Sequence, residues 1–365
     1  MSRPPLGTPG APPTVSILTP AYNSAKFIRQ TLDSALGQTF TDFEMIVIDD
    51  GSTDETRVIV EEYAGRDDRV RVISQSNAGI AAARNRAMSV ARGRFLALLD
   101  SDDVWLPSYL SEQMAILSER PDIAVLSANA INFGGAFDGS PLLPIRARGR
   151  IRFVSLLELV TVEDSLCILS IFRREVTDRI GGFDSTLRRS EDYDLWLRAA
   201  VAGFRIAVNP KPLGLYRRRP DSVSADEVLM LEAMKVPLNK VGRMCADRPE
   251  VVAAIRLQLG RFAHRCLLAN ARTALIDGDM PKFATQMASL ALHTGAVRYR
   301  LAGWLSSTAP FTIRWAYACK KAWIQITRPR RLLGAVFPSW SERSAMPRDV
   351  RTHVLRKVYV EGDTR

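Results

Sequence analysis

Residues 15–50 read VSILTPAYNSAKFIRQTLDSALGQTFTDFEMIVIDD and contain two short apolar runs on either side of an amphipathic stretch. The runs at Val15–Thr19 and Glu44–Asp49 have the composition of buried strands. Between them, apolar residues recur at helical spacing over Ala25–Leu36. A strand, a helix and a second strand in this order predict a βαβ unit with parallel strands.

The same alternation continues beyond this unit. The sequence predicts helices at Glu55–Tyr63 and Ile80–Ala91, and strands at Arg69–Ser74 and Phe95–Asp100. This order predicts an α/β fold of the Rossmann-like kind, with a mostly parallel sheet between layers of helices. In such sheets, ligands bind at the carboxyl ends of the strands.

The length of 365 residues exceeds what one compact core usually spans. We predict three regions: a Pro/Gly-rich flexible leader at 1–13, the α/β domain at 14–225 and a mainly helical region at 226–365. No uncharged apolar run reaches eighteen residues, so we do not expect a membrane-spanning helix. The four cysteines are widely spaced without a CxxC pair, which fits a reducing, cytoplasmic location.

The basic residues are unevenly distributed. Residues 1–225 hold 27 Lys and Arg against 28 Asp and Glu, whereas residues 226–365 hold 23 against 11. The basic region is either a solvated helical surface or a surface attracted to anionic lipid, or to a lipid-linked acceptor, at the inner face of the membrane. No basic motif with interleaved aromatic residues is present, so we expect no nucleic acid partner.

The three histidines (His264, His293 and His353) all lie in the last part of the chain. Chemistry in the α/β domain therefore cannot use a Ser-His-Asp or Cys-His pair, or a metal held by histidine. Any catalysis in the α/β domain must therefore depend on carboxylates.

Acidic clusters follow two of the predicted strands. Asp100 and Asp102 flank Ser101 after the fourth strand, where two carboxylates can hold a hard divalent cation beside phosphate oxygens. The alternative is a polar turn before the helix at Pro107. Asp49-Asp50-Gly51-Ser52 follows the second strand and predicts either a helix N-cap cluster or a carboxylate that accepts hydrogen bonds from a nucleotide base or ribose.

Four further groups are candidates. Tyr22, in the segment after the first strand, can stack on a base. Arg84, on a helix that begins near Gly79, can face a ligand or stay solvated. Glu191-Asp192 can supply a general base or only favour the start of a helix through its dipole. Arg217–Arg219 is either a phosphate clamp or a solvated turn.

Five ordered segments between Thr14 and Ser224, namely VSILTPAYN, IVIDDGSTDET, NAGIAAARN, LLDSDDVWLP and GGFD…SEDYDLWLRA, resemble the family 2 glycosyltransferases of GT-A fold. The resemblance implies a nucleotide-diphospho-sugar donor (a UDP-, GDP- or dTDP-sugar), a Mn²⁺ or Mg²⁺ ion and inversion at the anomeric carbon. It also implies a carbohydrate or lipid-linked acceptor, and we expect a role in surface polysaccharide or glycolipid synthesis.

The resemblance assigns roles to individual residues. It implies a cation held by Asp100 and Asp102, with Asp102 the more direct ligand. It implies Asp192 as the catalytic base beside Glu191. Nucleotide-sugar binding is expected from Pro20, Tyr22, Asn23, Asp49, Asp50, Arg84, Asp100 and Ser101.

The sequence departs from processive members of the family, which carry a QxxRW motif beside spanning helices. Gln325–Arg328 is followed by Pro329 instead, so we expect addition of a single sugar.

Two other functions fit parts of the sequence. One is a phosphatase with Asp100 as nucleophile, which would leave the earlier motifs unexplained. The other is a non-catalytic sugar-nucleotide-binding scaffold of a polysaccharide assembly complex, although every expected acidic residue is present.

Overall fold

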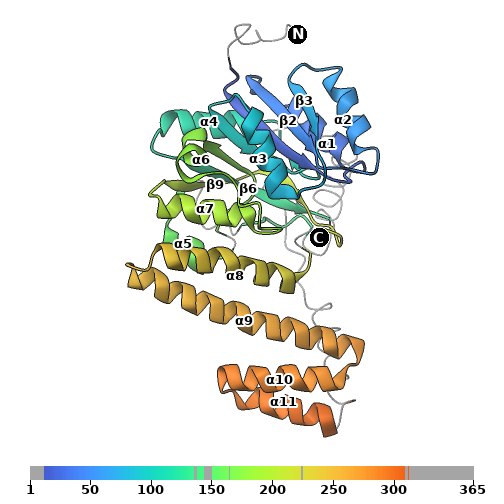
Figure 1. Cartoon of the computed structure of the whole chain (residues 1–365), viewed down its shortest axis with the longest axis vertical. Coiled ribbons are helices and arrows are strands. Elements are labelled where there is room, and N and C mark those ends of the chain that lie inside the picture. The colour runs from blue at the N-terminus through green and yellow to red at the C-terminus, as the bar shows by residue number, and fades with distance from the viewer. Residues whose placement is uncertain are drawn as a thin grey trace, which may run out of the picture. The chain divides into compact units, whose positions relative to one another are not determined.

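The computed structural model describes residues 12–134, 138–143, 150–163, 165–222, 225–308 and 311. These residues form two compact units, one within residues 12–222 and one within residues 225–311. Figure 1 shows the first unit as a sheet flanked by helices and the second as helices alone. The expected motif at Gln325–Arg328 and most of the expected leader lie outside the described residues.

The first half of the sheet is parallel. Its strands stand in the order β3-β2-β1-β4, so the chain reverses its direction of progress across the sheet after β3. The three connecting helices therefore cover both faces, because right-handed crossovers in opposite directions lie on opposite faces. The elements are β1 (Val15–Ala21), α1 (Ile28–Leu36), β2 (Phe43–Asp49), α2 (Thr56–Ala64), β3 (Val70–Ser74), α3 (Ile80–Val90) and β4 (Phe95–Leu98).

The second half of the sheet is mixed. The order continues β4-β8-β6-β9-β5, with β7 also paired to β9, and of these pairings only β6 with β9 is parallel. The elements are β5 (Val104–Trp105), α4 (Tyr109–Glu119), β6 (Val125–Phe133), β7 (Arg152–Val154), α5 (Leu156–Thr161), β8 (Ser170–Arg173), α6 (Arg174–Ile180), α7 (Glu191–Val201) and β9 (Ile206–Arg217). The α/β fold with helices on both faces is confirmed; the antiparallel pairings were not predicted.

Burial on both faces explains the sequence pattern of the parallel half. Every residue of β1 and β2 is buried. A strand covered on both faces has no solvent side, so it reads as a continuous apolar run rather than as an alternation. The few polar residues in these strands have partners: the Ser16 hydroxyl, for example, donates to Glu44 Oε1 at 2.8 Å.

The second unit contains α8 (Glu227–Met244), α9 (Pro249–Asp277), α10 (Met280–Thr294) and α11 (Val297–Thr308). Successive helices pack against each other, and a cluster including Ala274, Leu275, Phe283 and Leu290 forms the core between α9 and α10. Proline within the first turn opens α9 and α10, and a glycine with positive φ closes each of them. None of the helices described is both long enough and apolar enough to cross a membrane.

Candidate active site

The carboxyl ends of β1, β2 and β4 meet at one edge of the sheet. Ala21 at the end of β1 pairs in register with Asp49 at the end of β2, and the Asp50 N–H donates to the Ala21 carbonyl at 2.8 Å. The hydroxyls of Ser24 and Ser101 lie 2.7 Å apart. The structure therefore brings together the segments after three strands that sequence analysis had singled out separately.

The acidic turn after β2 is built around Asp50 and Gly51. Both oxygens of the buried Asp50 carboxylate are used: Oδ1 accepts from the Gln75 side chain and the Ala78 N–H, and Oδ2 accepts from the Gly79 N–H at 2.9 Å. Gly51 has φ +75°, and a Cβ there would lie 2.8 Å from the Asn77 nitrogen. The glycine thus lets the turn touch the 75–79 segment, and Asp50 fixes the entrance to α3.

The segment after β1 contains one free ring and one fixed amide. Tyr22 is 52% exposed, so its ring is open to stacking. Asn23 has a left-handed backbone (φ +48°), and its Oδ1 accepts from the Thr53 N–H at 2.8 Å. Pro20 lies within β1, and Asp49 Oδ1 accepts from the Ser52 N–H at 3.1 Å. Asn23 and Asp49 therefore shape the loops, whereas the ring of Tyr22 is exposed at the surface.

Arg84 is the centre of the site. It lies on α3 and is 1% exposed. Its Nη2 donates to Asp100 Oδ1 at 2.6 Å, and its Nη1 donates to Glu191 Oε1. The guanidinium also stands 5.4 Å from the ring centroid of Phe183. One planar cation therefore joins the acidic turn after β4 to the acidic start of α7, two motifs that are distant in the sequence.

The charges of the site are tightly coupled. Burial lowers the pKa of Arg84, but the carboxylates of Asp100, Glu191 and Asp192 outweigh it, so the pKa is raised and the guanidinium stays charged. Burial raises the pKa of Glu191 to about 7, against the opposing effect of Arg84. Burial also raises the pKa of Asp192, again opposed by Arg84. Perturbed carboxyl groups that share a cation are typical of functional sites.

The start of α7 is held in an uncommon conformation. Ser190, the residue before Glu191, has φ +59° and ψ +25°, and its buried hydroxyl has no hydrogen-bond partner among the described residues. A non-glycine residue in this region costs free energy, and such residues concentrate at functional sites. The conformation places Glu191 against Arg84, whereas Asp192 is half-buried and its Oδ1 accepts from the Tyr193 N–H at 2.8 Å.

Asp102 contacts the arginine run Arg217–Arg219 at the end of β9. Arg219 Nε lies 3.1 Å from Asp102 Oδ2, and Arg217 Nε donates to the Asp102 carbonyl at 2.7 Å. The Arg217 N–H also donates to Asp103 Oδ1 at 2.8 Å. Burial and the neighbouring Asp100 raise the pKa of Asp102 to about 6, although both arginines oppose the shift. The run is therefore bound to the acidic turn and is not a solvated turn.

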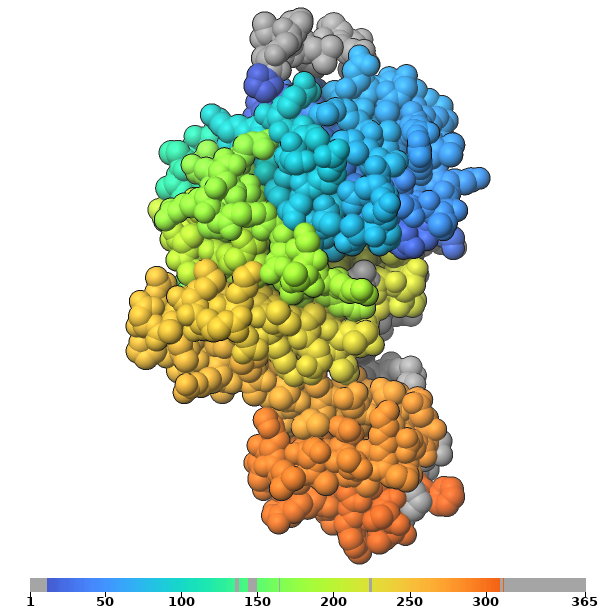
Figure 2. Space-filling view, viewed as in Figure 1, coloured from blue at the N-terminus to red at the C-terminus, as the bar shows by residue number. Residues whose placement is uncertain are grey.

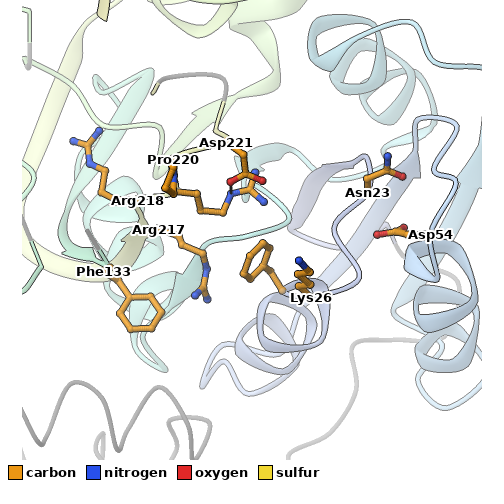
Figure 3. A pocket seen from close by; sticks show the side chains of 11 residues that line it. Asn23, Lys26, Asp54, Phe133, Arg217, Arg218, Pro220 and Asp221 are labelled. Carbon is orange, nitrogen blue, oxygen red and sulfur yellow. Dashed lines mark ion pairs between the residues drawn. The ribbon is translucent and has the colours of Figure 1, made fainter. Parts of the chain in front are cut away.

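A pocket of about 390 Å³ opens beside this contact. Figure 3 shows Asn23, Lys26 and Asp54 on one side of it, and Phe133 with the Arg217–Asp221 segment on the other. Four basic side chains and two acidic ones line it, so its net charge is positive. The pocket offers space for an anionic group next to Asp102.

The acidic turn after β4 fits a divalent cation by its donor chemistry. Two of its carboxylates, Asp100 and Asp102, are close enough for one to raise the pKa of the other. Among the described residues, no set of three or more His, Cys, Asp or Glu side chains gathers to enclose a metal. A cation here would therefore take its remaining ligands from phosphate oxygens and water, as Mg²⁺ commonly does.

Sequence analysis missed two features of the site. Arg84 was predicted to contact the nucleotide-sugar or to stay solvated, and its contacts with Asp100 and Glu191 were not predicted. Arg217–Arg219 was predicted to be either a phosphate clamp or a solvated turn, and its contact with Asp102 was not predicted. The sequence contained one signal for both contacts, namely the clusters of acidic residues after β4 and at residue 191. Buried carboxylates need basic partners, so arginines from other segments were to be expected beside them.

Comparison with known proteins identifies the family. Residues 16–181 match the family model for glycosyl transferase family 2. The chain is 34% identical over 226 residues to the teichuronic acid biosynthesis glycosyltransferase TuaG of Bacillus subtilis (strain 168), which covers 59% of this chain and 83% of that protein.

Two solved structures have the same fold. TarS 1–349 of S. aureus, in complex with UDP-GlcNAc, matches 77% of this chain and 92% of its own, with a TM-score of 0.55 and 22% identity. The mannosyltransferase PcManGT of Pyrobaculum calidifontis, in complex with GDP-Man and Mn²⁺, matches 88% and 91%, with a TM-score of 0.53 and 21% identity. At these identities the likeness shows the fold alone. The match to TuaG, together with the family model, establishes that this chain belongs to glycosyltransferase family 2.

Proposed function

We propose that this enzyme transfers one sugar from a nucleotide-diphospho-sugar to a hydroxyl of a carbohydrate or lipid-linked acceptor, with inversion at the anomeric carbon. The observation that carries the proposal is the bridge from Arg84 to Asp100 and Glu191, because it joins the acidic turn after β4 to the start of α7, where Asp192, the candidate base, follows Glu191. The relation to TuaG supports a role in the synthesis of a surface polysaccharide or glycolipid.

The donor nucleotide would lie across the ends of β1 and β2. Tyr22 stacks on the base, while Pro20, Asn23, Asp49 and Asp50 shape the loops around the nucleoside. A UDP-, GDP- or dTDP-sugar fits this proposal, since TarS was solved with UDP-GlcNAc and PcManGT with GDP-Man.

Asp100 and Asp102 would hold a Mn²⁺ or Mg²⁺ ion, with Ser101 beside the phosphates. PcManGT was solved with Mn²⁺, which supports this assignment. When bound, the cation neutralises the charge that develops on the leaving diphosphate. Arg219, at 3.1 Å from Asp102 in this structure, is a second cation available to the same phosphates.

Asp192 would act as the base. Glu191 is held by Arg84, so it positions the start of α7, and the half-buried Asp192 is left to face the acceptor. The acceptor oxygen attacks the anomeric carbon as its proton passes to the Asp192 carboxylate. The bond from that carbon to the diphosphate oxygen breaks, and the nucleoside diphosphate leaves with the electron pair. One displacement inverts the anomeric centre.

The basic C-terminal region completes the proposal. It would bring the enzyme into peripheral contact with an anionic membrane, where a lipid-linked acceptor resides. The excess of 23 basic over 11 acidic residues in 226–365 supports this contact.

The test measures release of nucleoside diphosphate from a panel of UDP-, GDP- and dTDP-sugars with Mn²⁺ or Mg²⁺, and the anomeric configuration of the product by NMR. We expect one nucleotide class to react, with inversion. Asp192→Asn should bind that donor normally and react at least about 100-fold more slowly. The matched control is Asp68→Asn, at an exposed acid on the turn before β3, and it should react normally.

Retention of configuration would refute the single displacement. A normal rate for Asp192→Asn would refute the assigned base. Donor binding without any turnover in the wild-type protein would favour a sugar-nucleotide-binding scaffold.

A further inference from the structure

The outer face of α11 exposes a row of apolar side chains. Val297 is 66% exposed, Leu301 53% and Trp304 60%. Their spacing of four and three residues places them on one side of the helix. Leu292 at the end of α10 and Phe311 are also largely exposed. Large apolar side chains grouped in this way mark a binding surface, whereas single ones are ordinary.

The opposite face of α11 already has a partner. Tyr299 and Ala302 pack against the core between α9 and α10. Gly303 lies so close to α10 that a Cβ there would stand 3.4 Å from the Met287 Cβ. The exposed row is therefore not the packing face of a helix that has failed to dock. It is the remaining side of a helix whose other side is buried.

The charged side chains of α10 and α11 are all basic. From Met280 to Ser341 the sequence has nine Lys and Arg residues and no Asp or Glu. Two of the basic residues, Arg298 and Arg300, lie on α11 itself and are exposed. Figure 2 shows the surface of the α10–α11 segment in orange. Because α10 and α11 carry basic side chains and no carboxylate, their surface is attracted to an anionic layer.

Exposed tryptophan, aliphatic side chains and arginines on one short helix match the composition of helices that lie in a membrane interface. Tryptophan prefers the headgroup level, and arginine binds lipid phosphates there. An interface with another protein does not require helices without acidic side chains, whereas α10 and α11 contain none. These observations favour a lipid surface over a protein partner.

We propose that the outer face of α11, formed by Val297, Leu301 and Trp304 with Arg298 and Arg300, binds the surface of an anionic phospholipid bilayer. The inference rests on the membrane contact proposed above and names the surface that makes it. The apolar row enters the boundary between headgroups and acyl chains, and the two arginines contact lipid phosphates.

The test uses the full chain and vesicles of phosphatidylcholine with or without about 30% phosphatidylglycerol. We expect the wild-type protein to sediment with the anionic vesicles and to dissociate as the salt concentration rises. The double variant Leu301→Ser/Trp304→Ser should lose on the order of 10-fold or more in partition coefficient. Arg298→Gln/Arg300→Gln should lose a similar amount on anionic vesicles and nothing on neutral ones.

Leu257→Ser is the matched control, because Leu257 is 56% exposed on α9 in the same unit. It should bind vesicles like the wild type. Donor binding, measured in parallel, should be unchanged in every variant.

Failure of the wild type to bind anionic vesicles would overturn the membrane contact itself. Equal vesicle binding by the wild type and the Leu301/Trp304 variant would overturn the assigned surface. It would also be overturned if that variant lost self-association but still bound vesicles. None of these outcomes bears on sugar transfer.

Discussion

Replacing Arg84 by methionine removes the cation between two acidic motifs but keeps most of the side-chain volume. In the wild type, Arg84 contacts Glu191 and lies 2.6 Å from Asp100. Breaking a buried ion pair by removing one partner costs about 3–5 kcal/mol, because the other partner stays buried and unpaired. We expect Arg84→Met to lower the free energy of unfolding by this amount at pH 8.

The loss should be smaller at acidic pH. Burial raises the pKa of Glu191 to about 7, so at about pH 5.5 this carboxyl group is largely protonated and needs its cation less. We expect about half the destabilisation there. Arg84→Lys should be intermediate at pH 8, because an ammonium keeps the charge but cannot reach two carboxylates in a fixed plane.

Urea unfolding followed by circular dichroism measures the effect, with the transition of the α/β unit analysed separately from that of the helical unit. The matched control is Arg57→Met, which breaks a solvent-exposed pair with Glu61 on α2 and should leave the transition unchanged. Equal destabilisation by Arg84→Met and Arg57→Met, or an effect of Arg84→Met that does not depend on pH, would contradict a stabilising bridge at Arg84.

Three further predictions concern the same edge of the sheet. The pKa of Glu191 is about 4.3 in the unfolded chain and about 7 in the folded protein. Between these two pH values, the folded protein keeps a proton on Glu191 that the unfolded chain has lost. The free energy of unfolding should therefore fall by about 2–3 kcal/mol as the pH rises across this window. Glu191→Gln should flatten that slope in urea titrations, and an unaltered slope would assign it to other groups. Gly51→Ala should destabilise by about 2 kcal/mol, since φ is +75° and the new Cβ would meet the Asn77 nitrogen at 2.8 Å; an alanine variant of normal stability would show that the turn rearranges freely. Asp102→Ala should abolish the Mn²⁺-dependent part of nucleotide affinity in calorimetric titrations, whereas retained Mn²⁺ dependence would move the cation to other ligands.

The parallel half of the fold could be predicted because its signals are local. Each strand is a short apolar run followed by a polar turn, and each intervening segment has helical periodicity. The acidic turns after β2 and β4 follow directly from this order, since the carboxyl ends of parallel strands meet. The α/β class and the family were predicted correctly on this basis.

The antiparallel half could not be predicted in the same way. The sequence between residues 123 and 217 has no regular alternation, and β8 enters the sheet between β4 and β6, which both precede it in the chain. Such insertion depends on pairing between distant segments, which periodicity does not encode. The central contacts of the site have the same character: Arg84 meets Glu191, and Arg219 meets Asp102, each across more than 100 residues.

The most direct test of the central claim is thermal unfolding of the purified protein with UDP, GDP and dTDP, each with and without Mn²⁺. A ligand at a hundred times its dissociation constant stabilises the native state by about 2.7 kcal/mol, which is readily measured as a rise in Tm. We expect a Mn²⁺-dependent rise in Tm with one of these nucleotides, and we expect Asp102→Ala to abolish it. Unchanged Tm values with every nucleotide, with or without the metal, would contradict a nucleotide-sugar site at the Arg84 bridge.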